Sequence, residues 1–140
     1  FLPAGLLEQD FICLVSPKHP SIRSRLGAQA YLNAAHVEVL SGKSHSILEE
    51  ALKAQGIERQ VLLQIPGFLG LASVVADTDL VATVPRQIGE TIGKQGGLKV
   101  MKCPLNIPTF TVKQYWHIRM HHDPANRWLR QLCASLYMNG

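Results

Sequence analysis

Residues 41–46, Ser-Gly-Lys-Ser-His-Ser, form the most polar candidate site in the sequence. They offer hydroxyls, a lysine and a histidine just before a helical pattern. Free backbone N–H groups and the positive end of the helix dipole would suit a carboxylate or a phosphate there. The Gly-Lys-Ser triplet does not complete a P-loop, because Val37 stands where that motif requires glycine. A capped surface turn explains the same residues, and the local sequence on its own favours this simpler interpretation.

Residues that could bind a metal form no convincing cluster elsewhere. His117 and His121 are four residues apart, but Ile118 replaces the glutamate of the zinc motif H-E-x-x-H, and the segment follows a strand-like run. The cysteines stand singly and far apart, which predicts reduced structural thiols and neither a disulfide framework nor a zinc site: Cys13, Cys103 and Cys133. We therefore expect no metal and no cofactor.

Catalytic arrangements are equally sparse. No G-x-S-x-G nucleophile elbow is present, and Asp77 and Asp79 flank a predicted loop without a histidine nearby in sequence. The isolated His19 and His36 are expected to be structural. Tertiary folding could still assemble a triad from distant residues, but the sequence predicts no catalytic residues and a protein that is not an enzyme.

Length and composition are those of one ordinary globular domain. The 140 residues are 46% hydrophobic and 17% charged, enough for a substantial core but short for two full domains. The net charge of +4 comes from scattered lysines and arginines, which indicates a mildly basic solvated surface and not a DNA-binding patch. The most apolar region, residues 61–85, is interrupted by proline and charged residues and cannot cross a bilayer as a helix. Because the chain begins with Phe1 and no leader is recognisable, we expect part of a longer cytoplasmic protein without membrane contact.

Short apolar runs rich in β-branched residues alternate with helical patterns along the chain. Strands are predicted at residues 11–15, 36–40, 60–65, 80–84, 98–102 and 110–118. Helices are predicted at residues 26–35, 68–76 and 86–93 and from Asp123 onward. A further helix is expected from an N-cap at Ser46, with Glu49 completing a capping box and Gly56 at its C-terminal end.

This alternation predicts an α/β fold with a mostly parallel mixed sheet flanked by helices. In such sheets ligands bind where the strands end and the helices begin. Three segments occupy that position in the predicted order of elements: residues 41–46, 66–68 and 85–87.

Several runs together resemble the effector-binding domain of LysR-type transcriptional regulators. They are FICLVSPKHP at residues 11–20, LKAQGIER at residues 52–59, TDLVATVP at residues 78–85, WHIR at residues 116–119 and DPANRWLR at residues 123–130. The resemblance covers nearly the whole chain in order. It is strongest to the subgroup that includes the regulators of naphthalene, salicylate and nitrotoluene degradation and the nodulation regulators.

The resemblance implies a type 2 periplasmic-binding-protein-like fold, in which two subdomains are joined by crossing strands. Residues 13–114 would form a nearly complete second subdomain. Residues 1–12 and 115–140 would supply the hinge strands and remnants of the first subdomain. The N-terminal winged helix-turn-helix would lie outside this chain, so that DNA would be contacted only by that other part of the parent protein.

The resemblance also implies a small-molecule effector, aromatic or a carboxylate, in the cleft between the subdomains, and signalling by cleft closure. Aromatic-acid sensors of the subgroup place an effector-contacting histidine at the position of His45. Close relatives also carry a histidine at the position of Gln9, and the glutamine here argues against a salicylate-like specificity. With the family in view, ligand contact becomes the favoured interpretation of residues 41–46. The implied effector-binding residues are Gln9, Ser44, His45, Ser46, Pro66, Phe68, Gln87 and Val112.

Relatives of this kind assemble as dimers and tetramers, and the matching surface here would be the strand at residues 60–65 with the helix at residues 68–76. Two other classes remain open at this point. A solute-binding module of a transport system shares the fold, and an α/β enzyme could assemble its site from distant residues.

Overall fold

The computed structural model describes the backbone of residues 2–116 and the side chains of residues 8–110. Its elements follow in the order β1 (Leu2–Gln9), β2 (Phe11–Val15), α1 (Ala28–Asn33), β3 (Ala35–Val39), α2 (Gly42–Ala54), β4 (Gln60–Ile65), α3 (Leu71–Ala76), β5 (Val81–Pro85), α4 (Arg86–Gly96), β6 (Lys99–Lys102) and β7 (Phe110–Trp116). Within these residues, no helix has the length and apolar character that a bilayer span requires.

Five of the strands form one mixed sheet in the order β4-β3-β5-β2-β6. β3 runs parallel to β4 and β5, whereas β2 runs antiparallel to β5 and β6. The α/β class is therefore confirmed. Parallel pairing accounts for two of the four strand pairs and not for most of them, because β2 enters the sheet against the direction of its neighbours.

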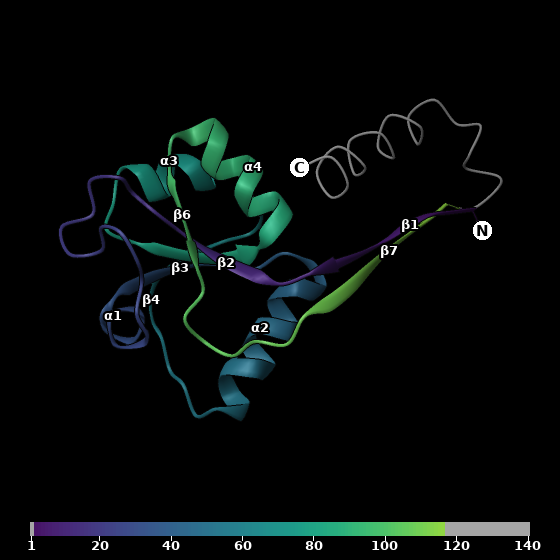
Figure 1. The fold of residues 1–140 in the computed structure, drawn as a ribbon, viewed down its shortest axis with the longest axis horizontal. Helices are drawn as coiled ribbons and strands as arrows, with labels where there is room; N and C mark the ends of the chain where they lie inside the picture. Colours follow the sequence, from purple (N-terminus) through teal and green to yellow (C-terminus); the bar gives the residue numbers. More distant parts are fainter. Residues whose placement is uncertain (1, 117–140) are drawn as a thin grey trace.

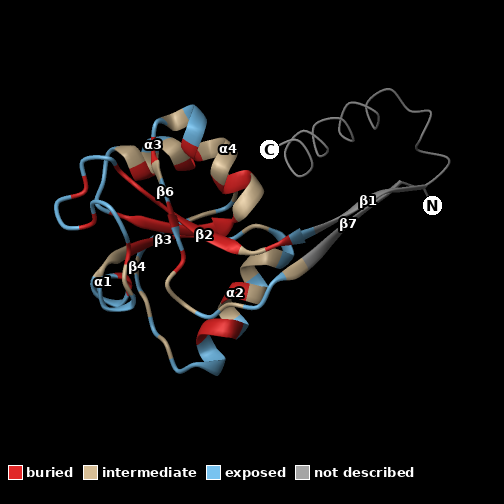
Figure 2. Ribbon diagram, viewed as in Figure 1, coloured by how far each residue is buried: buried red, intermediate tan, exposed pale blue. Residues whose placement is uncertain are grey.

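Helices cover both faces of this sheet, with α3 and α4 on one side and α1 and α2 on the other (Figure 1). The alternation of side chains along β2 explains how one strand serves both layers. Ile12 and Leu14 pack in the core with α3 and α4, while Cys13 packs with Tyr31 of α1 and Phe11 packs with Leu48 of α2. Every residue of β2 is buried, as the red central strand of Figure 2 shows. This burial on both faces is why its sequence is an uninterrupted apolar run.

β1 and β7 form a separate antiparallel ribbon that extends away from the five-stranded sheet (Figure 1). Their backbone register pairs Leu7 with Val112 and Gln9 with Phe110. Both strands therefore adjoin the large sheet at one place, where β1 leads into β2 and where Phe110 begins β7.

Most predicted elements are present with small shifts, and β2 and β4 have the predicted bounds. The third helix was expected from residue 68 but begins at Leu71, because Gly70 adopts a left-handed φ of 83° that breaks the chain direction before it. Gly56 lies just after α2 as expected, in a Schellman motif in which Gly56 N–H donates to Lys53 O and Ile57 N–H donates to Leu52 O.

The predicted start of α2 is wrong. Ser46 is not its N-cap, because the N-cap position is held by Ser41, five residues earlier, and the helix begins at Gly42 with no side-chain cap bond. The Ser-x-x-Glu spacing that predicted a capping box lies inside the helix, where the side chain of Glu49 pairs with Arg59. Residues 42–46 are consequently the first turns of a helix and not a loop. The predicted helix from Asp123 and the histidines at 117 and 121 lie outside the described residues.

Candidate functional site

The ends of β3, β4 and β5 bring together three segments that are far apart in sequence. Ser44 and His45 come from the start of α2, Phe68 from the turn after β4, and Pro85 from the end of β5. They line one small pocket, whose remaining lining residues are Phe11, Glu38, Val39, Leu48, Arg59, Thr83 and Val84. The three segments predicted to border a ligand thus meet beside the carboxyl ends of these strands.

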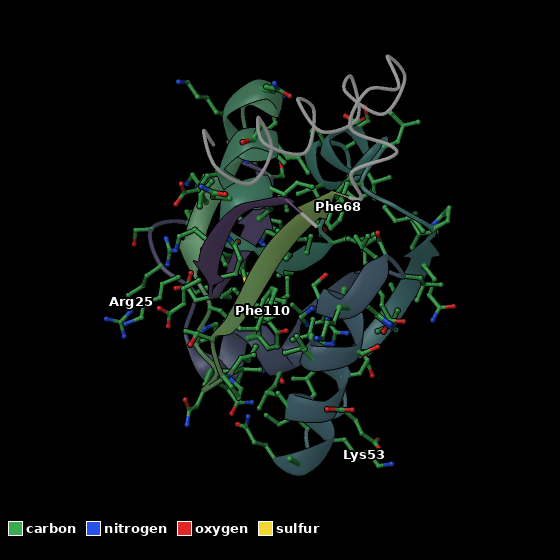
Figure 3. All side chains as sticks on the ribbon, turned by 90° about the vertical axis from the view of Figure 1, so that its right-hand side faces the viewer. Arg25, Lys53, Phe68 and Phe110 are labelled. Carbon is green, nitrogen blue, oxygen red and sulfur yellow. The ribbon has the colours of Figure 1, made fainter. Side chains whose placement is uncertain are left out.

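This pocket is too small to enclose a ligand by itself. Its volume is about 10 Å³, which is roughly the space that one water molecule needs, whereas sites for small ligands span about 300–1,000 Å³. Phe68 and Phe110 are labelled in Figure 3, which looks onto this end of the molecule. The described residues therefore offer one wall of a possible site and not a closed cavity.

His45 is held close to acidic side chains. Its Nε2 lies 3.3 Å from Glu38 Oε1 and 4.0 Å from Glu49 Oε1. These distances are within ion-pair range, although Nε2 is buried without an aligned hydrogen bond among the described residues. The side chain of His45 remains 26% exposed, so part of the imidazole can still meet a ligand.

Glu38, on β3, is the centre of this polar cluster. Gln64 Nε2 of β4 donates to its Oε1 at 2.9 Å, and Arg59 Nη2 donates to its Oε2 at 3.2 Å. Burial alone would raise the pKa of Glu38, but hydrogen bonds with its neighbours and the Arg59 charge outweigh burial and hold the pKa below its usual value. Glu38 is thus a buried anion at neutral pH.

The same cluster has the donor set of a metal site. Ligand atoms of Glu38, His45 and Glu49 lie within 4.8 Å of one another. However, Arg59 Nη2 lies 2.9 Å from Glu49 Oε1 as well as 3.2 Å from Glu38. The guanidinium already supplies the positive charge between the two carboxylates, which argues against a cation as their partner. The sequence contained one signal of this cluster, the i,i+4 spacing of His45 and Glu49 on a helix.

A second group of site residues lies where β1 meets α4. Gln9 is only 2% exposed, and its Oε1 accepts the backbone N–H of Gln87 at 3.2 Å. This bond satisfies one of the N–H groups that the first turn of α4 leaves without a helical partner. Gln87 Oε1 is buried without a hydrogen-bond partner among the described residues.

An ion pair reinforces this junction. Arg86 Nε and Nη2 donate to the two carboxylate oxygens of Asp10 at 2.6 and 2.8 Å, and Arg86 Nη1 donates to Glu90 at 3.2 Å. The hydrogen bond from Arg86 lowers the pKa of Asp10 below its usual value. The sequence did not single out Asp10 or Arg86 as a pair, because 76 residues separate them.

The predicted site residues fall into four groups. Ser44, His45 and Phe68 line the small pocket, and Gln9 contacts Gln87 beside α4. Ser46 and Pro66 are exposed and do not line that pocket. The side chain of Val112 lies outside the described residues.

The sequence matches the family model described as LysR substrate binding domain over residues 5–137. The chain belongs to the LysR substrate-binding domain family. The family predicted from the sequence is confirmed, and so is the type 2 periplasmic-binding-protein-like fold class.

Relatives and a solved structure agree with this assignment. The chain is 31% identical over 138 residues to the HTH-type transcriptional activator NahR of Pseudomonas putida, covering 98% of this chain and 46% of NahR. It is 30% identical over 131 residues to nodulation protein D 1 of Sinorhizobium fredii, covering 92% of this chain and 41% of that protein. The regulatory domain of MexT, a transcriptional activator in Pseudomonas aeruginosa, superposes with a TM-score of 0.67 at 28% identity, covering 97% of this chain and 70% of that structure. The chain thus spans less than half the length of either sequence relative.

Proposed function

We propose that this chain is the effector-sensing part of a LysR-type transcriptional regulator that responds to a small aromatic or carboxylate inducer. One observation carries the proposal: Ser44, His45 and Phe68 come from separate segments and converge beside the carboxyl ends of the strands, where α/β proteins bind ligands. The family membership supports a regulator over the alternative, a solute-binding module of a transport system.

The chemistry of this wall favours a flat apolar body that carries one anionic group. Phe11, Leu48 and Phe68 supply apolar surface, while His45 and Ser44 supply polar groups typical of ligand sites. The buried carboxylate of Glu38 also lines this pocket, but it is paired with Arg59, so an anionic ligand group would meet His45 and not an unpaired carboxylate. The amino-terminal turn of α2, where both polar residues lie, adds the positive end of a helix dipole.

The second wall would come from a first subdomain that lies largely outside this chain. In this proposal, residues 13–114 are the second subdomain, and residues 1–12 and 115–140 contain the hinge strands and remnants of the first. The β1–β7 ribbon supports the hinge assignment, because it is the only part of the described fold that leaves the large sheet.

Signalling would then proceed by cleft closure. An effector shifts the equilibrium only if it binds the closed arrangement better than the open one. The few residues at the ends of two crossing strands can absorb such a rotation. The change would reach DNA through a winged helix-turn-helix outside this chain. A protein with this role acts in the cytoplasm and is not an enzyme.

We further propose that copies of the regulator assemble through β4 and α3. β4 is an edge strand of the sheet, and Leu62 on it is 62% exposed. Leu69, just before α3, is 99% exposed. Apolar side chains beside an open strand edge are typical of a surface that another subunit covers.

Thermal unfolding of the full-length regulator with a panel of small aromatic acids and aliphatic carboxylates tests the effector proposal. A compound that binds the native state raises the melting temperature by mass action, equivalent to about 2.7 kcal/mol at a concentration of 100 times Kd. We expect one class of acids to raise it, and we expect His45→Ala to abolish most of that increase.

Glu50→Ala is the matched control, because Glu50 is an exposed residue of the same helix that does not line the pocket. This variant should respond to the same acids as the wild-type protein. An increase that survives unchanged in His45→Ala would move the ligand away from this wall. No increase with any acid would contradict the proposed effector class.

A further inference from the structure

β6 is the outer strand of the sheet on the side opposite β4, and within residues 2–116 no other strand pairs with its outer side. β6 is the last strand in the sheet order and pairs with β2 alone among the described residues. In an antiparallel pair, alternate residues direct their N–H and C=O groups away from the partner strand. The outer edge of Lys99–Lys102 therefore presents backbone donors and acceptors that a further strand could use.

A groove runs beside this edge. It has a volume of about 630 Å³ and is lined by residues 24–27 on one side and residues 100–106 on the other. Its lining includes three buried apolar side chains that belong to the core below, Leu26, Met101 and Cys103. The groove is thus large enough for several side chains and offers them an apolar floor.

The groove is also basic. Arg25 and Lys102 are exposed and line it, and no acidic residue is among the lining residues. Arg23 and Lys99 lie next to it, joined by a hydrogen bond of 2.6 Å from Lys99 Nζ to Arg23 O. None of these four cations forms an ion pair within the described part of the chain. Figure 3 shows Arg25 extending away from the body of the protein.

We propose that this groove binds an extended acidic segment of another protein, which adds as a strand to the outer edge of β6. Backbone hydrogen bonds would supply the pairing, and alternate side chains would meet the apolar floor, as in other complexes formed by strand addition. Acidic residues at the remaining positions would meet Arg25 and Lys102, whose groove has no carboxylate among its described lining residues.

Charge separates this partner from the other candidates. Lysines on an edge strand oppose pairing with a second copy of the same strand, because Lys99 and Lys102 would approach like charges. A nucleic acid would use the cations but would leave the backbone groups of β6 and the apolar floor without partners. An acidic strand is the partner that satisfies all three features.

The test uses a short fluorescent peptide in which glutamate and valine alternate. Fluorescence anisotropy at moderate salt measures its binding to the full chain. We expect saturable binding that slows amide hydrogen exchange in β6. Arg25→Glu and Lys102→Glu should each weaken binding by at least about fivefold, because each change replaces an attraction by a repulsion. Lys53→Glu is the charge-matched control, because Lys53 is an exposed lysine on α2 and does not line this groove.

Two further probes separate strand addition from simple charge attraction. The same peptide methylated at alternate backbone nitrogens cannot complete the ladder and should bind at least about tenfold more weakly. Equal weakening in Lys53→Glu and Lys102→Glu, or equal binding of the methylated peptide, would overturn the proposal.

Binding of a DNA duplex but not of the peptide would assign the surface to nucleic acid and would overturn the proposal as well. Self-association that Lys102→Glu changes, without peptide binding, would assign the surface to a second copy of the chain and would likewise overturn it.

Discussion

Arg59 joins three elements through two carboxylates. It lies just before β4 and contacts Glu38 of β3 and Glu49 of α2, and its side chain is only 2% exposed. A guanidinium so deeply placed stabilises the fold only because both carboxylates pair with it. Removal of the arginine would leave Glu38, which is 11% exposed in its side chain, without its main countercharge.

We therefore expect Arg59→Met to lower the free energy of unfolding by about 3 kcal/mol, near the lower end for breaking a buried ion pair because Glu49 remains partly hydrated. Urea unfolding at neutral pH measures this change. Lys53→Met, at an exposed lysine of α2, should change the stability by less than about 0.5 kcal/mol. A similar small effect for Arg59→Met would show that the cluster does not stabilise the domain.

His36 makes the stability of the fold depend on pH. Its side chain is buried, and its Nε2–H donates to Tyr31 O at 2.8 Å. Burial lowers the pKa of His36 in the folded state. The unfolded chain gains a proton near pH 6.5 that the folded protein resists, so this contribution to stability is complete above about pH 6.5 and is lost as the pH falls below it.

The free energy of unfolding should therefore decrease as the pH falls from about 6.5 to about 5.5. His36→Asn keeps a hydrogen-bond donor but does not titrate, and its stability should change less steeply over the same interval even if it is lower throughout. Denaturant unfolding at several pH values gives both slopes. Equal slopes would show that other groups cause the dependence.

At the level of elements, α4 approaches β2 and β5 closely because a glycine faces them. A Cβ added at Gly89 would lie 2.5 Å from Ile12 Cδ1 and 2.7 Å from Val84 Cγ2, well inside van der Waals contact. Both neighbours are buried in the same core cluster, so neither can move away freely.

We expect Gly89→Ala to destabilise the domain by about 1–2 kcal/mol. Overpacking of this kind costs about 1–3 kcal/mol, whereas the better helix propensity of alanine returns about 1 kcal/mol at most. Gly67→Ala is the control, because no atom lies within 4 Å of a Cβ at that position. Thermal unfolding compares the two, and a stabilised Gly89→Ala variant would show that α4 shifts outward at little cost.

For the molecule as a whole, the exposed apolar side chains on β4 are the basis of the proposed self-association. Leu62 and Leu63 are 62% and 39% exposed on this edge strand. Leu62→Lys should raise the dissociation constant for self-association by at least tenfold, because it places a charge in the proposed interface. Sedimentation velocity over a range of concentrations measures this constant. Leu32→Lys, at an equally apolar but separate exposed site on α1, should leave the constant unchanged. A wild-type protein that stays monomeric at high concentration would contradict the proposed assembly.

Several features could be predicted from local sequence. β2 and β4 have the predicted bounds because apolar runs bounded by proline and glycine end where the chain must turn. The three segments expected at the carboxyl ends of the strands, residues 41–46, 66–68 and 85–87, were identified because their position follows from the order of the elements alone. The start of α2 was missed because a capping-box spacing also occurs inside helices, where only tertiary contacts decide its role.

The order of the elements from β2 to β7 and the α/β class follow from the sequence, because apolar periodicity and turn residues act over a few neighbouring positions. The family follows from the resemblance of several runs along the chain, and β1 was not among the strands predicted from the periodicity. The polar cluster of Glu38, His45 and Arg59 was decided by the tertiary structure. These residues form one unit only because β3 pairs with β4 and α2 packs across them. The direction of β2 and the basic groove beside β6 were decided in the same way, since each depends on which strands become neighbours in the sheet. Pairing between distant strands brings such side chains within hydrogen-bond distance, and no local pattern in the chain specifies it.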